Sequence, residues 1–449
     1  MPTIYLLNFI SHKRIRMTRS IKIAVSAALA LSATSAFATN GDHLIGLGAK
    51  ARGMGGVGIG MSHGAESALV NPALISSVKG TEVSFGGTLF MPKVSADMGA
   101  GSSDSAADMS MIPEVSIASK INDNFFIGIG MWGTAGMGVD YRDETGNTSN
   151  MNMITNLQLM QFGVPMTYSM SGFSIGIAPI LQYGALDINY KTDLGHAQMD
   201  QTGAVVGPVG PENVGNGVAQ DLAFGFNIGA AYTMSGFTIG ASYKSPIEME
   251  YKGQLSAATA PFVQGGVFPG AMDDKLEQPY EVGLGASYEF SGSTIALDYK
   301  KIAWSSAKGY EDFGWDDQNV IAVGYQYATA NYAIRLGYNR SDSPISDAGA
   351  MTVAAAGAAA GGMPTPNYFG GNALNTFNLL GFPATVESHF TVGGTYNISE
   401  TTSLDLAYVY APESSTKLMT MPDMTTGADM YTEVTHSQNA LSFQLNYVF

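Results

Sequence analysis

Alternation of apolar and polar side chains, repeated along most of the chain, is the feature that most constrains its fold. In the final residues, Leu441, Phe443 and Leu445 share one parity, while Ser442 and Gln444 share the other. Successive side chains of a strand point to opposite faces of a sheet, so this pattern predicts strands with one apolar and one polar face. We count fourteen candidate strands. They lie near residues 81–95, 111–121, 124–142, 153–170, 172–192, 219–234, 236–252, 276–290, 292–308, 317–328, 330–341, 384–397, 400–418 and 434–449.

The connections between these strands alternate in length. Short ones such as Ser171-Gly172, Ser235-Gly236 and Ser291-Gly292 carry typical turn residues. Long ones, such as 193–218 and 342–383, lie between the other pairs of strands. Short turns at one end and long loops at the other are typical of outer-membrane barrels.

Composition favours the same class of fold. Charged residues make up 13% of the chain, about half the usual share of a soluble protein. Apart from the N-terminus, no window approaches the roughly 20 apolar residues of a membrane helix. We therefore predict an all-β protein, a transmembrane antiparallel β-barrel of about 14 strands over residues 81–449.

The first 38 residues are typical of a signal peptide. Basic residues precede an apolar run at 23–31, and Ala36-Phe37-Ala38 fits the small-residue cleavage pattern, so we expect cleavage after Ala38. Met17 is a plausible true start. The alternative is a membrane-anchor helix. The basic residues are Lys13, Arg14, Arg16, Arg19 and Lys22.

Charge and residue types exclude several functions. The mature chain keeps 16 of the 21 basic residues against all 37 acidic ones, which argues against a nucleic-acid partner. The chain has no cysteine, and its six histidines show no metal-ligand spacing, so we expect no metal and no cofactor.

Residues 39–80 are the long part of the mature chain that lacks strand alternation, and we expect them to form a plug in the barrel lumen. Within them, Gly60-Met61-Ser62-His63-Gly64 matches a hydrolase nucleophile pattern, and 53–58 resembles a dinucleotide loop. Neither has the surrounding strands and helices that such chemistry needs. We therefore predict that the protein is not an enzyme, and the glycines more plausibly allow tight turns of a compact plug.

One strand loses its alternation where Gly133, Gly136 and Gly138 lie close together. Glycine inside a strand often marks a bulge or kink. Such a break in the wall is one way for a hydrophobic solute to leave sideways into lipid, and a bulge without a transport role is the alternative.

Two of the long loops are unusually apolar. Exposed apolar groups commonly mark binding sites, so these loops are candidates for ligand capture. The alternative is that they pack on one another and cap the barrel. The candidate residues are Phe262, Val263, Val267, Phe268, Phe377 and Phe382.

With these features in place, the chain resembles the FadL/TodX family (OMPP1) of long-chain fatty acid and toluene outer-membrane transporters. The resemblance spans essentially the whole mature chain, and its most specific mark is the triplet Asn71-Pro72-Ala73. The other stretches that carry it are 46–48, 52–53, 65–74, 297–299 with 304–305, 335–338 with 342–344, and 443–449.

The resemblance implies a fourteen-stranded barrel, an N-terminal hatch with Asn71-Pro72-Ala73, ligand capture among the outer loops, and lateral release through a kink in the third strand, here at 133–138. The region near the fifth strand, Tyr183 to Asp187, lacks the base that would suit a fatty acid carboxylate. Lys300 and Arg335 are the alternatives, with Asp298 and Glu281 as their competing partners in the wall.

We therefore predict a channel in a Gram-negative outer membrane for passive uptake of hydrophobic compounds. Long-chain fatty acids are the first candidates and neutral hydrocarbons the alternative. A structural or adhesin barrel and an outer-membrane hydrolase are candidates of other classes. Expected partners are a hydrophobic small molecule, outer-membrane lipid and, through the strand ending at Phe449, the barrel assembly machinery.

Overall fold

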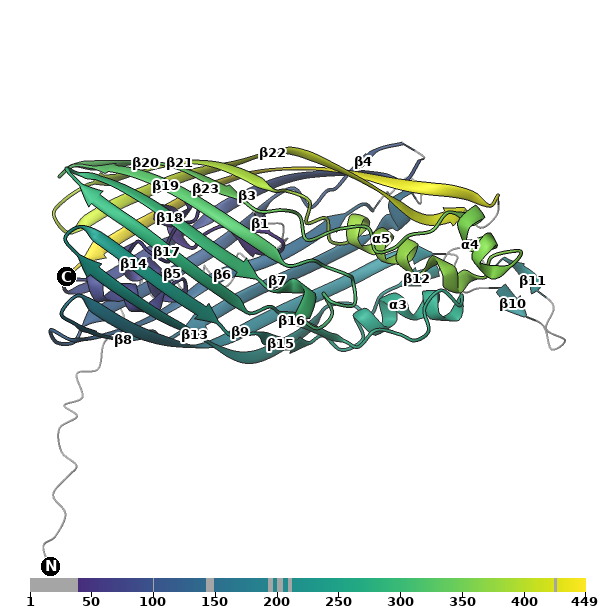
Figure 1. Ribbon diagram of the computed structural model, residues 1–449, viewed down its shortest axis with the longest axis horizontal. Helices are drawn as coiled ribbons and strands as arrows, with labels where there is room; N and C mark the ends of the chain where they lie inside the picture. The colour runs from purple at the N-terminus through teal and green to yellow at the C-terminus, as the bar shows by residue number, and fades with distance from the viewer. Residues whose placement is uncertain are drawn as a thin grey trace, which may run out of the picture.

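The computed structural model describes residues 39–99, 101–142, 149–192, 197–199, 205–208, 212–423 and 426–449 (Figure 1). Its main feature is an antiparallel barrel of fourteen wall strands, closed where the last strand, β23, pairs with the first, β3. This confirms the predicted fold. The barrel is long, with tight turns at one end and extended loops at the other.

Each expected strand is present in the wall, with the fourth divided into β7 and β8. The wall strands are β3 (Thr81–Asp97), β5 (Ser110–Lys120), β6 (Phe125–Asp140), β7 (Ile154–Gly163), β8 (Met166–Met170), β9 (Phe173–Thr192), β13 (Ala219–Met234), β14 (Phe237–Lys244), β17 (Glu281–Phe290), β18 (Ser293–Ile302), β19 (Gln318–Ala328), β20 (Tyr332–Arg340), β21 (Ser388–Asn397), β22 (Thr402–Asp423) and β23 (Ala428–Val448).

The two faces of the wall differ in polarity as the alternation predicts. In β23, Leu441 and Phe443 are 45% and 42% exposed, whereas Ser442 and Gln444 are 0% and 1% exposed. The apolar side chains therefore cover the outside, where lipid solvates them, and the polar ones face the lumen.

Three of the short connections are Ser-Gly pairs with positive φ at both residues. At Ser171 and Gly172, for example, φ is 52° and 82°. This is the type I′ geometry, whose twist matches that of the strands it joins.

Proline interrupts three of the expected strands, whereas the one expected at 292–308 ends at Ile302, just before the helical turn at Trp304. Pro165 separates β7 from β8. Pro246 ends the seventh strand early, and Pro279 separates β17 from the segment before it, because proline has no N–H for the ladder. The residues beyond form a separate hairpin of β15 (Ile247–Glu250) and β16 (Lys275–Gln278).

The long loops contain short helices, which the sequence did not predict. None of the helices in the described ranges is long and apolar enough to cross a bilayer. The loop elements are β4 (Ser103–Asp104), η3 (Ser149–Asn152), β10 (Ala197–Met199), β11 (Val205–Pro208), β12 (Glu212–Val214), α3 (Leu255–Gln264), η4 (Trp304–Ser306), α4 (Val353–Ala360), η5 (Pro366–Phe369) and α5 (Gly370–Leu380).

The N-terminal segment, residues 39–80, precedes the first wall strand and lies against the inner face of the wall (Figure 1). Its backbone makes a short hairpin and three short helical turns rather than long strands, which agrees with its missing alternation. These elements are β1 (Thr39–Asn40), β2 (His43–Leu44), α2 (Gly48–Arg52), η1 (Gly64–Leu69) and η2 (Pro72–Ser77).

Candidate functional site

Asn71 organises the turn that carries the predicted hatch motif. Its Oδ1 accepts a hydrogen bond from the backbone N–H of Ala73 and caps η2. Its Nδ2 donates to the carbonyl oxygens of Ile59 (2.8 Å) and, in the wall, Ala230 (3.2 Å). Thr167 of β8 donates to the carbonyl of Pro72 (2.6 Å). The motif is thus buried between the segment and the wall, and its role as a hatch remains a prediction.

Glycines of the wall let the N-terminal segment approach the strands closely. A Cβ at Gly240 would collide with the carbonyl oxygen of Ile59, and one at Gly229 would collide with Asn71. A side chain at either position would push the segment off the wall. Gly176, Gly285, Gly324, Gly337 and Gly393 make similar close approaches.

Asp298 of β18 anchors the segment through backbone groups. Its carboxylate accepts hydrogen bonds from the N–H groups of Gly58 (2.6 Å), Ile59 (2.7 Å) and Gly60 (3.2 Å). Successive N–H groups directed at one anion are a common anion-binding arrangement. Of the two competing partners that the sequence interpretation named, Glu281 rather than Asp298 pairs with Lys300, because the glycine-rich backbone takes the oxygens of Asp298.

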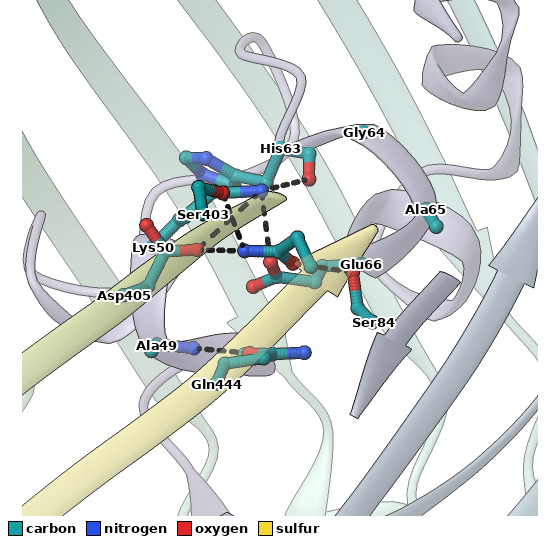
Figure 2. A network of polar contacts seen from close by, with 12 residues as sticks. Ala49, Lys50, His63, Gly64, Ala65, Glu66, Ser84, Ser403, Asp405 and Gln444 are labelled. Atoms are coloured by element: carbon teal, nitrogen blue, oxygen red, sulfur yellow. Dashed lines mark hydrogen bonds and ion pairs between the residues drawn. The ribbon is translucent and has the colours of Figure 1, made fainter. Parts of the chain in front are cut away.

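Lys50 of α2 lies at the centre of a second anchor, a buried charge network between the segment and the wall (Figure 2). Its Nζ lies 3.1 Å from Glu66 of η1, 3.6 Å from Asp405 of β22 and 3.8 Å from Glu82 of β3. Arg335 of β20 contacts the same Asp405 at 3.6 Å. The network therefore contains three carboxylates and two cations.

The excess carboxylate makes Glu66 a proton-binding group near neutral pH. Burial raises its pKa from 4.5 to about 7, although Lys50 opposes the shift. Burial also lowers the pKa of the neighbouring His63 to about 4, so that imidazole stays neutral at physiological pH. When Glu66 is protonated, the charges of the network balance, because the carboxylates of Glu82 and Asp405 then face the two cations, Lys50 and Arg335.

Replacing Glu66 by Gln should remove a pH dependence from the seating of the segment. A docked Glu66 holds its proton up to about pH 7, whereas an exposed one releases it near 4.5. Between pH 4.5 and about 7, the docked segment therefore holds one more proton than the undocked segment. The docked state consequently loses stability as pH rises through that range. Sugar leakage from proteoliposomes should rise between pH 5 and pH 8 in the wild type and stay flat in Glu66→Gln. An equal slope in both proteins would contradict this assignment.

Arg52 makes a third anchor beside the point where the pairing of β5 with β6 ends. Both terminal nitrogens of its guanidinium, Nη1 and Nη2, donate to the carboxylate of Glu114 in β5. Nη1 also donates to the hydroxyl of Thr88 (2.7 Å). Both Arg52 and Glu114 are 1% exposed. A bidentate pair of this kind fixes orientation as well as position.

Beyond Glu114 the ladder between β5 and β6 stops. Glu114 and Trp132 form the last pair given by the described residues of these two strands, although β5 begins at Ser110 and β6 continues to Asp140. The hairpin of the N-terminal segment takes the vacant edge. His43 pairs with Ala135, and the N–H of Gly136 donates to the carbonyl of Asp42 (3.0 Å).

The three predicted kink glycines lie at this break. The register of β6 against β7 shifts between Gly133 and Ala135. This shift inserts one extra residue into β6, as in a β-bulge. Gly136 and Gly138 follow the bulge and pair with β7 on one side, while Gly136 binds Asp42 of the hairpin on the other. Whether ligand passes here remains a prediction.

The two carboxylate-binding candidates are both engaged in the wall. Lys300 lies 2.9 Å from Glu281, as the competing interpretation held, and Lys244 shares that carboxylate at 3.3 Å. Arg335 pairs with Asp405 and donates to Gln326 (2.8 Å). Sequence reasoning missed Asp405 and Lys244. Pairing of β14 with β17 brings Lys244 to Glu281, and the order β20, β21, β22 brings Asp405 to Arg335.

A lumen cavity of about 80 Å³ separates the N-terminal segment from the wall. Its lining includes His43, Leu44 and Thr134 beside the break, and Lys244, Glu281 and Lys300 of the wall, with Glu281 3.4 Å from His43. This volume is well below the roughly 300–1,000 Å³ of typical small-molecule pockets. The N-terminal segment must therefore shift before a long ligand can occupy the lumen.

The apolar loop residues meet in one cluster near the barrel mouth. Phe262 and Phe377 are 1% and 2% exposed, with ring centroids 5.1 Å apart. Phe268 stacks beside Phe262 (5.6 Å), and Phe382 lies near Phe313 (6.3 Å). Val267 is buried as well, and Val263 is half-buried. These contacts are expected of residues that cap the barrel mouth. For the same residues to capture a ligand, the cluster would have to open.

The hydrolase pattern does not assemble a catalytic pair. Ser62 hydrogen-bonds with the carbonyl of Leu74 (2.9 Å) and with Ser77, while Nε2 of His63 hydrogen-bonds with the carbonyl of Val57 (2.7 Å). Within the described ranges, no group of three or more His, Asp and Glu side chains has the spacing to hold a metal ion.

Comparisons with known proteins agree with this architecture. The model of the family described as "Outer membrane protein transport protein (OMPP1/FadL/TodX)" matches residues 24–354. An uncharacterized protein of Chlorobium limicola, encoded in the 5' region of a phosphoenolpyruvate carboxykinase gene, is 42% identical over 76 residues, which cover 16% of this chain and 37% of that protein.

Solved structures extend the likeness over the barrel. A Pseudomonas aeruginosa FadL homologue is 15% identical with a TM-score of 0.67, covering 91% of this chain and 100% of that one. The Pseudomonas putida toluene transporter TodX is 16% identical with a TM-score of 0.61 (90% and 99% covered). The Ralstonia pickettii toluene transporter TbuX is 15% identical with a TM-score of 0.59 (90% and 98% covered). At identities of 15–16%, these similarities show that the chain shares the fold of these proteins.

Proposed function

Since the chain belongs to the OMPP1/FadL/TodX family of outer-membrane transport proteins, which are not enzymes, we propose that it takes up hydrophobic compounds by passive diffusion. The outer loops capture the compound, it binds in the lumen beside the N-terminal segment, and it leaves sideways into the membrane. Residues 39–80 act as the hatch that keeps the lumen closed to small solutes.

The break between β5 and β6 is the observation that carries this proposal. In lipid, each unpaired backbone group costs several kcal/mol, so a barrel wall normally pairs all of them. Here the edge of β6 pairs with the N-terminal hairpin through Asp42 and His43. A hairpin can withdraw more easily than a wall strand, and its withdrawal would open a path from the lumen to lipid.

Long-chain fatty acids are the first candidate substrates. Lys244 and Lys300 share the single carboxylate of Glu281 beside the lumen cavity. A ligand carboxylate could take over one lysine while Glu281 keeps the other, so no buried charge is left without a partner.

Neutral hydrocarbons are the second candidate class. Arg335 and Lys300 already have carboxylate partners, so a neutral ligand would leave each pair intact. Two solved structures with this fold are described as toluene transporters, which favours this alternative.

Replacing Lys300 and Arg335 together by Met should distinguish these classes. If either residue binds a carboxylate, the affinity for oleate should fall about tenfold or more, because hydrogen bonds to charged groups contribute about 1.5–3 kcal/mol. The affinity for toluene should stay near that of the wild type. Titration of the purified protein with both ligands measures the two effects.

The double variant with Lys301 and Lys308 replaced by Met serves as a control, since these lysines pair with Asp317 and Glu248 and neither lines the lumen cavity. Equal changes for oleate and toluene in the Lys300/Arg335 variant would show that neither residue recognises the carboxylate. A wild-type protein that binds neither ligand, and supports no uptake of either by cells, would refute the transport proposal.

We also propose how the protein reaches its site of action. Residues 1–38 direct export and are removed after Ala38. The strand that ends at Phe449 presents its apolar face, with Tyr447 and Phe449, to the barrel assembly machinery. Intact mass of the protein from outer membranes and a Phe449 deletion test these two points.

A further inference from the structure

The first described residues of the chain are buried in the lumen. Thr39 is 5% exposed and Asn40 is 0% exposed, and the two pair with Leu44 and His43 in the hairpin. Cleavage after Ala38, as proposed above, would make Thr39 the amino terminus of the mature chain.

That cleavage changes the chemistry of the first nitrogen. The backbone nitrogen of Thr39 donates a hydrogen bond to Oε1 of Gln438 in β23 (3.2 Å). After cleavage the same atom is an α-amino group, with an ordinary pKa of about 7.7–8.0. As an ammonium it carries a full charge and three donors, and a buried charge is costly unless an anion or several acceptors meet it.

The wall partner of this nitrogen is neutral. Nδ1 of His436 must donate to the carbonyl of Pro383 (2.9 Å), so its Nε2 accepts from Nε2 of Gln438 (3.1 Å). Oε1 of Gln438 therefore faces Thr39, and it also meets Nε2 of His389 (3.2 Å). One carboxamide oxygen thus serves two donors and does not neutralise an ammonium.

Asn40 supplies a second donor that lacks a partner. Its Oδ1 accepts from the hydroxyl of Ser341 (3.1 Å), which fixes the orientation of the amide. Its Nδ2 is buried and has no hydrogen-bond partner among the described residues. Buried donors are almost always satisfied, so this one indicates an acceptor that the protein itself does not provide.

We propose that the amino terminus created by signal cleavage binds the carboxylate of an amphiphile of the fatty acid class, with the α-ammonium of Thr39 and Nδ2 of Asn40 as its donors. This inference rests on the proposed function and on cleavage after Ala38. It would give the lumen a cation that no wall carboxylate has already paired.

Three other cations of the lumen already have carboxylate partners, which an α-ammonium at Thr39 would not share. Arg52 is held by Glu114, Arg335 by Asp405, and Lys50 by several carboxylates. If Arg52 turned toward a ligand, Glu114 would lose its cation. The nitrogen of Thr39 instead contacts the neutral amide of Gln438, and its hairpin also lies on the edge of β6 where the wall is open.

Two variants test the proposal, with oleate and oleyl alcohol as matched ligands that differ in the carboxylate. Inserting Gly-Ser between Ala38 and Thr39 moves the ammonium two residues away and leaves an amide at Thr39. Asn40→Asp keeps the acceptor for Ser341 but replaces the donor by an anion. Each variant should bind oleate about tenfold to a hundredfold more weakly, the range expected for hydrogen bonds to a charged group, with oleyl alcohol unchanged. Intact mass fixes the mature end, and heat-modifiable gel mobility shows that the barrel is folded.

Equal losses for oleate and oleyl alcohol, or no loss for either, would overturn the proposal. A wild-type mature mass that does not begin at Thr39 would overturn it as well. If the wild type binds both ligands and the variants behave like it, the terminus has no such role and the transport function stands. If the wild type binds neither ligand, the transport function itself fails.

Discussion

Valine at both Gly136 and Gly138 should abolish uptake of hydrophobic compounds while the barrel still folds and still binds ligand from outside. Both residues are buried in β6 past the last β5 pair, on an edge that the N-terminal hairpin covers. Valine favours regular strand pairing, and two branched side chains would fill the opening between β5 and β6. Transfer of labelled oleate or toluene into cells measures uptake, and gel mobility before and after heating reports the fold.

Gly394→Val is a matched control for this pair. Gly394 lies in β21 between two paired neighbours, on the parity of the exposed Phe390 and Val392. A side chain there meets one carbonyl at 3.1 Å and no open edge. Normal uptake by the correctly folded Gly136/Gly138 variant would exclude this exit and leave the glycines as parts of a structural bulge.

Deletion of residues 40–78 should convert the closed barrel into a leaky pore. Eight-stranded barrels fill their interior with side chains, whereas barrels of 16 to 18 strands hold aqueous channels, so a wall of fourteen strands leaves space to fill. Residues from three anchors, at Asp298, Lys50 and Arg52, hold the segment in that space. Without the segment, proteoliposomes should pass small sugars and cells should become sensitive to large antibiotics.

Asp298→Ala provides a graded comparison for the deletion. It removes one anchor and leaves the N–H groups of Gly58, Ile59 and Gly60 without their acceptor, so leakage should lie between that of the wild type and that of the deletion. Solute exclusion equal to that of the wild type after deletion of 40–78 would show that the segment is no plug.

The wall could be predicted because its pattern is local. The period of two in β23 and the Ser-Gly turns each depend on adjacent residues, and the structure confirms both. The split of the fourth expected strand at Pro165 and the hairpin after Pro246 were not foreseen. Its two strands pair across a helical loop, a contact that no single stretch of sequence displays.

The interior was harder to predict for a related reason. Lys50 meets Asp405, and Arg52 meets Glu114, across large separations in the chain. Such pairs depend on how the barrel closes. The glycine-rich stretch was expected to turn tightly, but nothing in its composition indicates that three of its N–H groups share Asp298. Helices α3 and α5 were also missed, because their apolar residues had been interpreted only as loop hydrophobicity.

The contacts of the N-terminal segment have a consequence for the order in which the protein can be made. The segment leaves the ribosome and crosses the inner membrane first, yet Thr39 binds Gln438 and Ala49 binds Gln444, in the last strand to be synthesised. Neither contact can form until β23 exists. The segment therefore reaches its final position against β23 only after the last strand has been exported. Truncation near the C-terminus should thus expose the N-terminus to periplasmic proteases, although the two lie at opposite ends of the gene.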